Sequence, residues 1–309
     1  MKRNSNISSS NIIPKVSIVS PSLNTARFLR STIESIITQT FTDYEYIVID
    51  GGSTDETIDI LKEYPQIKWV SEKEESDNGI LEAIWKGFYI SKGQYFTHIC
   101  ISDGFSDKDW LKKSVEVLDS DSEVSAVWGI HQEISEDGHL GKVAWPEYLG
   151  SYPPPQKMDF LPFWFANRKD IEIAAIFRRN VFEECYARNE LDEKYRFSLQ
   201  CALNYNFNTR GYLPYFLPYL AFYARTHKNQ KQERDYDVLD VAGKQYDQEI
   251  KDYRRKLFSG KVSHRFRNCN SNIIKEVSKA DLKLFKKAYF RYRLKYKLRK
   301  YFEKFMKHI

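Results

Sequence analysis

VSIVSPSLN (residues 16–24) and YIVIDGGSTDET (residues 46–57) are the two stretches that decide the predicted fold. Each starts with a short run of β-branched and apolar residues and stops at Pro or Gly among polar residues, which is typical of a strand that runs into a loop. Between them, apolar residues from 28 to 37 recur at helical spacing. Strand, helix and strand in this order indicate a βαβ unit with parallel strands.

The same alternation continues to about residue 130. We expect further strands at 67–70, 95–101 and 124–130, a helix that begins near 53, and helices at 80–90 and 108–118. The predicted fold class is therefore α/β, with a mostly parallel sheet flanked by helices. Polar clusters follow three of the strands, at 21–24, 50–53 and 102–104. Because such sheets bind ligands beyond the carboxyl ends of their strands, we expect a ligand site there.

The bulk composition excludes several classes of protein. Hydrophobic residues make up 42% and charged residues 29% of the chain, which is ordinary for a soluble globular protein. Four widely spaced cysteines argue against a disulfide scaffold or a zinc site and fit a reducing cytoplasm. Residues 1–14 are polar, with no apolar core of a signal peptide, and we expect them to form a disordered leader. No uncharged apolar run approaches the roughly 20 residues of a membrane-spanning helix.

The positive charge of the chain is concentrated in its tail. Eleven Lys and Arg against one acid, Glu303, give residues 282–309 a net charge of +10, so the remaining body carries −4 of the total +6. An apolar stripe runs among these cations at helical spacing, through Leu282, Phe285, Tyr289, Tyr292, Tyr296, Phe302, Phe305 and Ile309. We expect a helix that lies on an anionic membrane surface. The alternatives are a nucleic-acid patch, which the lack of any nucleic-acid motif disfavours, and a helix that folds back onto the body.

The middle of the chain gives weaker signals. Residues 145–168 are rich in aromatic side chains and Pro, and we expect an irregular segment, either a packed connection or a loop that faces the acceptor. Helical patterns follow at 179–187 and 193–206. The 15% aromatic content fits stacking on sugar rings, but taken alone it is better explained by Tyr and Phe that enrich the core and surface.

The chain resembles glycosyltransferase family 2 at VSIVSPSLN (16–24), YIVIDGGSTDET (46–57) and SDNGILEAIWKG (76–87). The family's usual forms are a strand that ends in Pro-Ser/Thr-x-Asn, a strand that ends in Asp-Gly-Gly-Ser-Thr-Asp, and an Asp-x-Gly that leads to Asn-Lys-Gly. Each piece alone is weak, but their order and spacing are specific. The resemblance covers residues 16–230 and implies a GT-A fold, a Rossmann-like fold of inverting enzymes that use nucleotide-diphosphate sugars.

The resemblance also implies a donor site. Asp50 and Asp77 are expected to read the nucleobase, because a carboxylate can accept a hydrogen bond from the imide N–H of uracil. RTHKNQK (225–231) resembles the family's Arg-x-His-x-x-Gln-Lys, whose cations approach the diphosphate. The complete set of expected binding residues is Pro21, Ser22, Asn24, Asp50, Gly51, Asp77, Gly79, Lys86, Ser102, Arg225 and Lys231.

A metal ion, Mg²⁺ or Mn²⁺, is implied as well, since it usually neutralises the leaving diphosphate in GT-A enzymes. The family holds it with an acid pair after the strand that here spans 95–101. Asp103 persists at this place, whereas Gly104 replaces the second acid. His227 is the other expected ligand or phosphate donor. Asp107 and Asp109 follow closely, but acids in this position are more typical of the start of a helix.

Inversion also requires a base that takes the proton of the acceptor hydroxyl. The family uses an acid some eight residues after a Phe-Asp-Glu, which Leu191-Asp192-Glu193 resembles, but the expected segment here reads Gln200-Cys201-Ala202. Asp192 and Glu193 are the nearest acids and the provisional base, although capping the following helix is the more common role for such acids.

These observations define one leading hypothesis and one alternative. Residues 15–232 form the GT-A domain, with a donor half at 15–130 and an acceptor half at 131–232, and residues 233–309 form a helical extension that ends in the basic tail. The chain transfers a sugar from a UDP-sugar to a glycan or lipid-linked acceptor at the inner, cytoplasmic face of the membrane, in polysaccharide or lipopolysaccharide synthesis. The alternative is a degenerate relative that binds the donor as a non-catalytic subunit.

Overall fold

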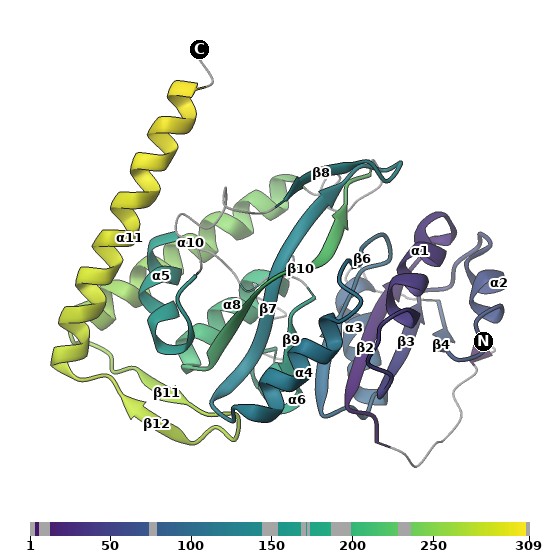
Figure 1. Cartoon of the computed structure of the whole chain (residues 1–309), viewed down its shortest axis with the longest axis horizontal. Coiled ribbons are helices and arrows are strands. Elements are labelled where there is room, and N and C mark those ends of the chain that lie inside the picture. Colours follow the sequence, from purple (N-terminus) through teal and green to yellow (C-terminus); the bar gives the residue numbers. More distant parts are fainter. Residues whose placement is uncertain are drawn as a thin grey trace.

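The computed structural model describes residues 4–5, 13–73, 79–143, 154–167, 171, 174–186, 199–227 and 236–306. Its centre is a ten-stranded sheet (Figure 1). The strand order is β1-β4-β3-β2-β5-β9-β7-β10-β6, and β8 pairs with β7 outside this order. The strands are β1 (Asn4–Ser5), β2 (Val16–Ser22), β3 (Tyr44–Asp50), β4 (Lys68–Ser71), β5 (Tyr95–His98), β6 (Gly104–Phe105), β7 (Val124–Ile134), β8 (Leu140–Val143), β9 (Ile176–Arg178) and β10 (Leu213–Arg225). The predicted α/β class is confirmed.

The long strand pairings are parallel. β2 pairs with both β3 and β5, β3 pairs with β4, and β7 pairs with β10, whereas the antiparallel pairings join only short stretches. The register aligns Ser22 with Asp50, and Asp50 with Ser71, so the last residues of β2, β3 and β4 lie side by side. The polar clusters predicted at the strand ends therefore share one edge of the sheet.

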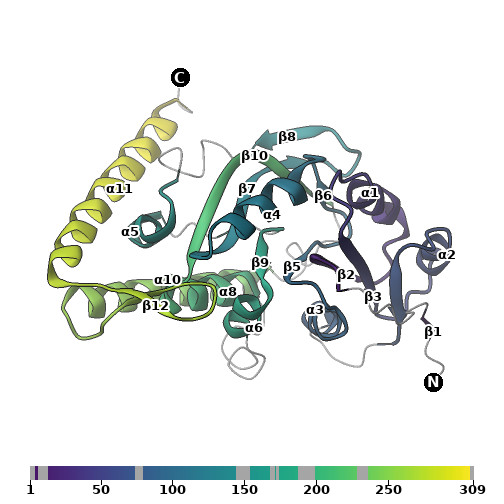
Figure 2. The same cartoon turned by 60° about the horizontal axis from the view of Figure 1, so that its bottom comes forward.

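Helices cover both faces of this sheet. One layer contains α1 (Ala26–Ile37), α2 (Thr57–Lys62) and α4 (Trp110–Ser120), and the other contains α3 (Gly79–Ile90), α5 (Phe160–Asn167), α6 (Arg179–Cys185) and α8 (Leu199–Arg210). Figure 2 shows α1 and α4 on one side of the strands and α3 and α6 on the other. Alternate strand residues explain the two layers: Ile18 and Val48 pack on the α1 side, and Val19 and Ile47 on the α3 side.

Part of the aromatic segment at 145–168 differs from the irregular structure that we expected. Residues 144–153 and 168 lie outside the described residues, but Lys157–Asp159 form the 3₁₀ turn η1 and Phe160–Asn167 form α5. Phe160, Phe163 and Trp164 are all buried. A helix that is buried on every side has no polar face, so its sequence lacks the periodicity by which helices are recognised.

The C-terminal extension joins the core on the α3 side. It consists of α10 (Tyr236–Phe258), the hairpin of β11 (Arg265–Arg267) and β12 (Ile273–Glu276), and α11 (Lys279–Met306). Phe285, Tyr289 and Tyr292 of α11 are buried against α5, α10 and the hairpin. The stripe that we expected to face a membrane therefore packs against the body over these residues, as the fold-back alternative proposed.

Two further boundaries can be compared with expectation. Asn4 and Ser5 pair with β4 as strand β1, although they belong to the leader predicted to be disordered. The division at residues 130 and 232 stays a prediction, while the side chains of α10 and α11 share one hydrophobic cluster with those of β2, β3 and α3.

We predict that two neighbouring aromatic residues of α11 contribute very differently to the free energy of unfolding. Tyr289→Ala removes a ring that is 4% exposed and packed on Phe258, so it should lower the free energy of unfolding by about 3 kcal/mol. Phe290→Ala, at 63% exposure, should change it by less than about 0.5 kcal/mol. Urea denaturation of both variants measures the difference, and equal effects would contradict the orientation of the helix.

Candidate functional site

The loops after β2 and β3 are joined into one unit by hydrogen bonds. The Asp55 carboxylate accepts from the Ala26 N–H at 3.1 Å and from the Thr57 N–H at 3.0 Å, so it lies at the first turns of both α1 and α2. Asn24 has a φ of +52° and accepts from the Thr54 N–H at 2.8 Å. Burial raises the pKa of Asp55, but the hydrogen bonds from Thr57 and Ala26 outweigh it and hold the pKa below its usual value.

Asp50 lies at the centre of this unit and is 1% exposed. Its Oδ2 accepts from the N–H groups of Gly52 and Ser53 at 3.0 Å and from the Ser71 hydroxyl at 2.7 Å, and its Oδ1 accepts from the Ser53 hydroxyl. Gly51 donates its N–H to the Ser22 carbonyl at 2.8 Å. The carboxylate thus ties the loop after β3 to the end of β4, while the Gly51 backbone ties it to β2. The role of Asp50 in reading a nucleobase stays a prediction.

The loop after β5 is fastened to helix α1. Ser102 adopts a φ of +129°, a strained value for a residue with a side chain. The Thr32 hydroxyl donates to the Asp103 carbonyl at 2.7 Å, and the Ser35 hydroxyl accepts from the Phe105 N–H at 3.1 Å. Two hydroxyls of α1, of which that of Thr32 is buried, therefore fasten this loop to the helix.

Asp103 is the acid that the fold leaves at the end of this loop. It is 8% exposed, and its Oδ1 accepts from the Arg225 N–H at 3.0 Å and from the Ser102 hydroxyl at 3.3 Å. Among the described residues, Oδ2 accepts no hydrogen bond. Burial raises the pKa of Asp103 to about 6, against the lowering effect of Arg225 and Ser102. One carboxylate oxygen is therefore left to meet a ligand.

Arg225 and His227 both contact the ring of Phe28 in α1, close to the loop after β5. The Phe28 ring lies 4.8 Å from the His227 ring and 5.2 Å from the Arg225 guanidinium. The guanidinium also donates to the carbonyls of Ser102, at 3.1 Å, and Glu136, at 3.2 Å. Arg225 thus ties the loop after β5 to the turn after β7, while its backbone holds Asp103.

The residues at this site fit a cation that is shared with a substrate. Within the described ranges, no group of three or more His, Cys, Asp or Glu is arranged to hold a metal ion alone. Mg²⁺ commonly binds through one or two carboxylates and completes its coordination with substrate phosphates and water. Asp103 fits such a role, and the expected ligation by His227 stays a prediction.

The close packing around position 104 explains why a glycine suits it. A Cβ at this position would lie 2.5 Å from both the Ser35 Oγ and the Tyr223 hydroxyl, because β6 is pressed between α1 and β10. A side chain at this position would displace Ser35 and Tyr223, so the packing here suits a residue without a Cβ. The same close packing accompanies the loss of the second carboxylate expected after β5.

Lys86 lies apart from this centre, in α3, where it forms an ion pair with Glu72 after β4. The next residue, Gly87, allows α3 to approach β2 closely, since a Cβ there would lie 2.3 Å from a Val19 methyl. Gly79 begins α3. Pro21 is the last-but-one residue of β2, beside Ile49 of β3, so the described donor residues divide between the sheet edge and α3.

Four predicted site residues lie outside the described residues: Asp77, Asp192, Glu193 and Lys231. Gln200, which stands where an acid was expected, donates its side-chain amide to the Ile171 carbonyl. Gln200 therefore makes a structural contact between α8 and Ile171, and the identity of the base is a question for experiment.

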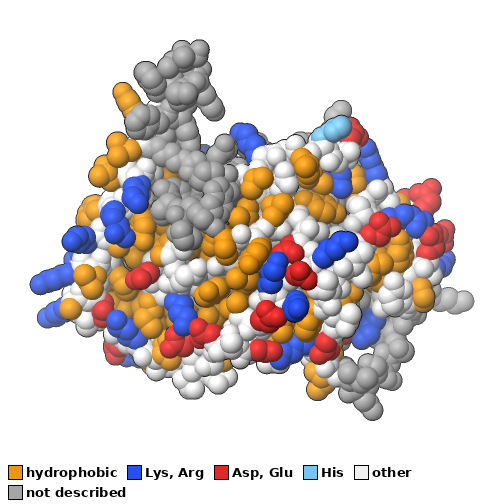
Figure 3. Space-filling model, viewed as in Figure 1, with side chains coloured by type: hydrophobic (Ala, Val, Ile, Leu, Met, Phe, Trp, Pro, Cys, Tyr) orange, Lys and Arg blue, Asp and Glu red, His pale blue; other side chains and the backbone are white. Residues whose placement is uncertain are grey.

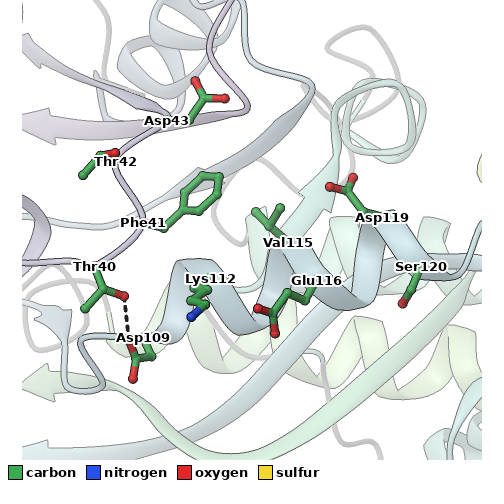
Figure 4. Close-up of a pocket in the computed structure, with 10 residues that line it drawn as sticks. All are labelled: Thr40, Phe41, Thr42, Asp43, Asp109, Lys112, Val115, Glu116, Asp119 and Ser120. Atoms are coloured by element: carbon green, nitrogen blue, oxygen red, sulfur yellow. Dashed lines mark hydrogen bonds between the residues drawn. The ribbon is translucent and has the colours of Figure 1, made fainter.

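A depression of about 900 Å³ in the described surface lies elsewhere (Figure 4). It is lined by residues 40–43 and by α4, including Asp109, whose carboxylate accepts from the Thr40 hydroxyl at 2.6 Å. Asp119 at its far end pairs with Lys15 and Tyr95, which precede β2 and begin β5. The depression is thus at the amino edge of the sheet, opposite the polar strand ends.

A comparison with models of protein families shows the family of the chain. The model described as glycosyl transferase family 2 matches residues 17–208. The chain belongs to this family.

Two curated relatives of this family-2 chain are themselves named for sugar transfer. It is 29% identical to the chondroitin synthase of Escherichia coli over 145 residues, which cover 44% of the chain and 20% of the synthase. It is 30% identical to a PGL/p-HBAD biosynthesis glycosyltransferase of Mycobacterium bovis over 118 residues, 38% of the chain and 46% of that enzyme. The chain thus matches less than half the length of either relative, and these glycosyltransferases support a transferase activity.

A solved structure shows the same fold. The S. aureus TarS fragment 1–349 in complex with UDP-GlcNAc superposes with a TM-score of 0.54 at 15% identity, covering 75% of this family-2 chain and 66% of the fragment. The GT-A fold expected from the sequence is thereby confirmed.

Sequence reasoning missed the contribution of α1 to the candidate site of this family-2 chain. Phe28, Thr32 and Ser35 lie on one face of the helix, at spacings of four and three residues, and hold the loop after β5 and the Arg225 region. The available signal was Thr32, a hydroxyl residue that falls on the apolar face of an otherwise amphipathic helix.

We predict opposite effects for two Gly→Ala substitutions. Gly104→Ala should lower the free energy of unfolding by about 2 kcal/mol, because its methyl group has no room between Ser35 and Tyr223. Gly243→Ala, in α10 with no atom within 4 Å of a Cβ, should raise it by about 0.5–1 kcal/mol. Thermal or urea unfolding measures both. A Gly104→Ala variant as stable as the wild type would show that position 104 has room for a side chain.

Proposed function

We propose that the chain is an inverting glycosyltransferase that moves a sugar from a UDP-sugar to a glycan or lipid-linked acceptor, in the synthesis of a cell-surface polysaccharide or lipopolysaccharide. One observation carries the proposal. The loops after β2, β3 and β5 share the carboxyl edge of the sheet and leave one Asp103 oxygen available among buried, hydrogen-bonded neighbours. The TarS fragment, which has the same fold, forms a complex with UDP-GlcNAc, and this supports a UDP-linked donor.

The donor roles follow from the contacts of the loops. Asp50 and Asp77 read the uracil imide, and the strand-end residues Ser22 and Asn24, with Gly51, shape the wall beside it. Asp103 would hold Mg²⁺ or Mn²⁺ against the diphosphate, and His227 and Lys231 add charge toward it. The cation, when bound, neutralises the negative charge that develops on the leaving diphosphate. Arg225 keeps the Asp103 carboxylate in place through its backbone N–H.

The acceptor half completes the proposal. Asp192 or Glu193 takes the proton of the acceptor hydroxyl as the hydroxyl attacks the sugar. The chain works at the cytoplasmic face of the membrane. No described helix is long and apolar enough to cross a bilayer.

A second candidate function is donor binding without turnover. Two observations favour it: Gln200 stands at the position of the expected base with its amide bonded to the backbone, and the close packing at Gly104 leaves little room for an acid. Such a subunit would present a UDP-sugar site to a catalytic partner.

The variant Asp103→Asn separates these functions. If the chain is an enzyme, the substitution should lower UDP release from a UDP-sugar panel with membrane extract by at least about 100-fold, because the diphosphate loses its cation-binding carboxylate. Binding of UDP without metal should change only a few-fold, since the nucleobase contacts remain. The measurement is a coupled assay of UDP release together with calorimetry.

Asp107→Asn is the matched control. Asp107 accepts from the Asp109 N–H and pairs with Lys113 at the start of α4, so its loss should leave turnover within about twofold. UDP binding by the wild type without turnover on any acceptor would favour the non-catalytic function. Equal losses in both aspartate variants would remove Asp103 from the proposed centre.

A further inference from the structure

Helix α11 has two apolar faces, of which only one is covered. Phe285, Tyr289 and Tyr292 form the inner face and pack edge-on against Phe266, Phe258 and Phe163. This contact fixes the rotation of the helix about its axis. The opposite face of α11 therefore points away from the body of the protein, toward the solvent.

The outer face carries a second stripe, which the sequence pattern did not single out. Its members are spaced by four, three, four, four and three residues, as on one side of a helix: Lys283, Lys287, Phe290, Leu294, Leu298 and Tyr301. The four apolar side chains are exposed by 63%, 59%, 51% and 73%, respectively. The whole stripe, from Lys283 to Tyr301, extends over about 27 Å at 1.5 Å per residue.

Cations surround this stripe without acids to neutralise them. Lys283, Lys287, Arg291, Lys295 and Lys297 are all exposed, and the sequence from 283 to 298 contains no Asp or Glu. Asp281, which precedes this run, is already paired with Lys275 at 2.8 Å. The outer face thus combines exposed leucines and aromatic rings with uncompensated positive charge.

The position of the helix leaves this face accessible. Figures 1 and 2 place α11 at the end of the molecule that is remote from β2, β3 and β4, with α5 between α11 and the sheet. The space-filling view shows orange and blue side chains intermixed along that margin (Figure 3).

We propose that the outer face of α11, residues 283–301, docks on the surface of a bilayer that contains anionic phospholipids. Apolar side chains enter the boundary between headgroups and acyl chains, and lysines and arginines meet the phosphates. A second copy would bring the same positive charge against itself, which disfavours a dimer through this face. Nucleic acid would use the cations but would leave Phe290, Leu294 and Leu298 in water.

This inference rests on the membrane placement in the proposed function, names the surface that makes the contact, and uses none of the donor residues. The buried stripe holds the helix on the body, and the exposed stripe holds the body on the lipid. Vesicle binding can therefore fail while sugar transfer is intact, and the reverse.

Vesicle sedimentation with the full chain tests the inference, using phosphatidylcholine vesicles with and without phosphatidylglycerol. The wild type should bind the anionic vesicles at least tenfold more tightly than the neutral ones. Phe290→Ala/Leu294→Ala/Leu298→Ala should weaken anionic binding at least tenfold through lost apolar contact. Lys287→Gln/Arg291→Gln should do so at least tenfold by removing two charges from the lipid field.

Two controls use residues of the same types elsewhere. Leu140→Ala, at 76% exposure on β8, and Lys108→Gln, exposed before α4, should bind vesicles as the wild type does. Unfolding midpoints of all variants should agree, because every changed side chain is exposed. The inference is overturned if the wild type ignores anionic lipid, if the apolar triple variant binds as well as the wild type, or if sedimentation velocity shows a dimer that this triple variant abolishes.

Discussion

The site depends on the two hydrogen bonds that the Asp55 carboxylate accepts. By accepting from Ala26 and Thr57, it joins the first turns of two helices that follow neighbouring parallel strands. A parallel sheet aligns its strand ends, but the loops beyond them are free to diverge unless something ties them together. Here an acid between two helix N-termini does so, where the backbone N–H groups are otherwise unpaired and the helix dipoles favour negative charge.

Helix α1 passes this constraint on to the rest of the site. Its first turn is held by Asp55, its middle by the hydrogen bond from Thr32 to the loop after β5, and its Phe28 ring meets the region of Arg225. This close packing leaves little room for a side chain at position 104. Asp103 is the single acid here, where the family commonly has two, so a cation would need further ligands from its substrate.

The parts of the fold that could be predicted are those whose pattern has one physical meaning. Apolar strands that alternate with helices and run into polar loops, such as the one at Asp50-Gly51, predict a parallel sheet with polar ends. The predicted strands and helices up to residue 134 appear in the expected order. Helix α5 was missed because a helix buried on all sides has no periodicity. The basic tail was correctly assigned to a helix, but its stripe pattern is the same whether Tyr289 faces lipid or protein.

Nucleotide binding at the carboxyl edge of the sheet is the central claim, and a crystal structure of the chain with a UDP-sugar and Mg²⁺ tests it most directly. We expect the uracil beside the loop at Asp50 and the diphosphate within reach of the Asp103 Oδ2, with α1 unmoved. Nucleotide density in the depression between Thr40 and Glu116, at the opposite edge, would contradict this placement of the donor.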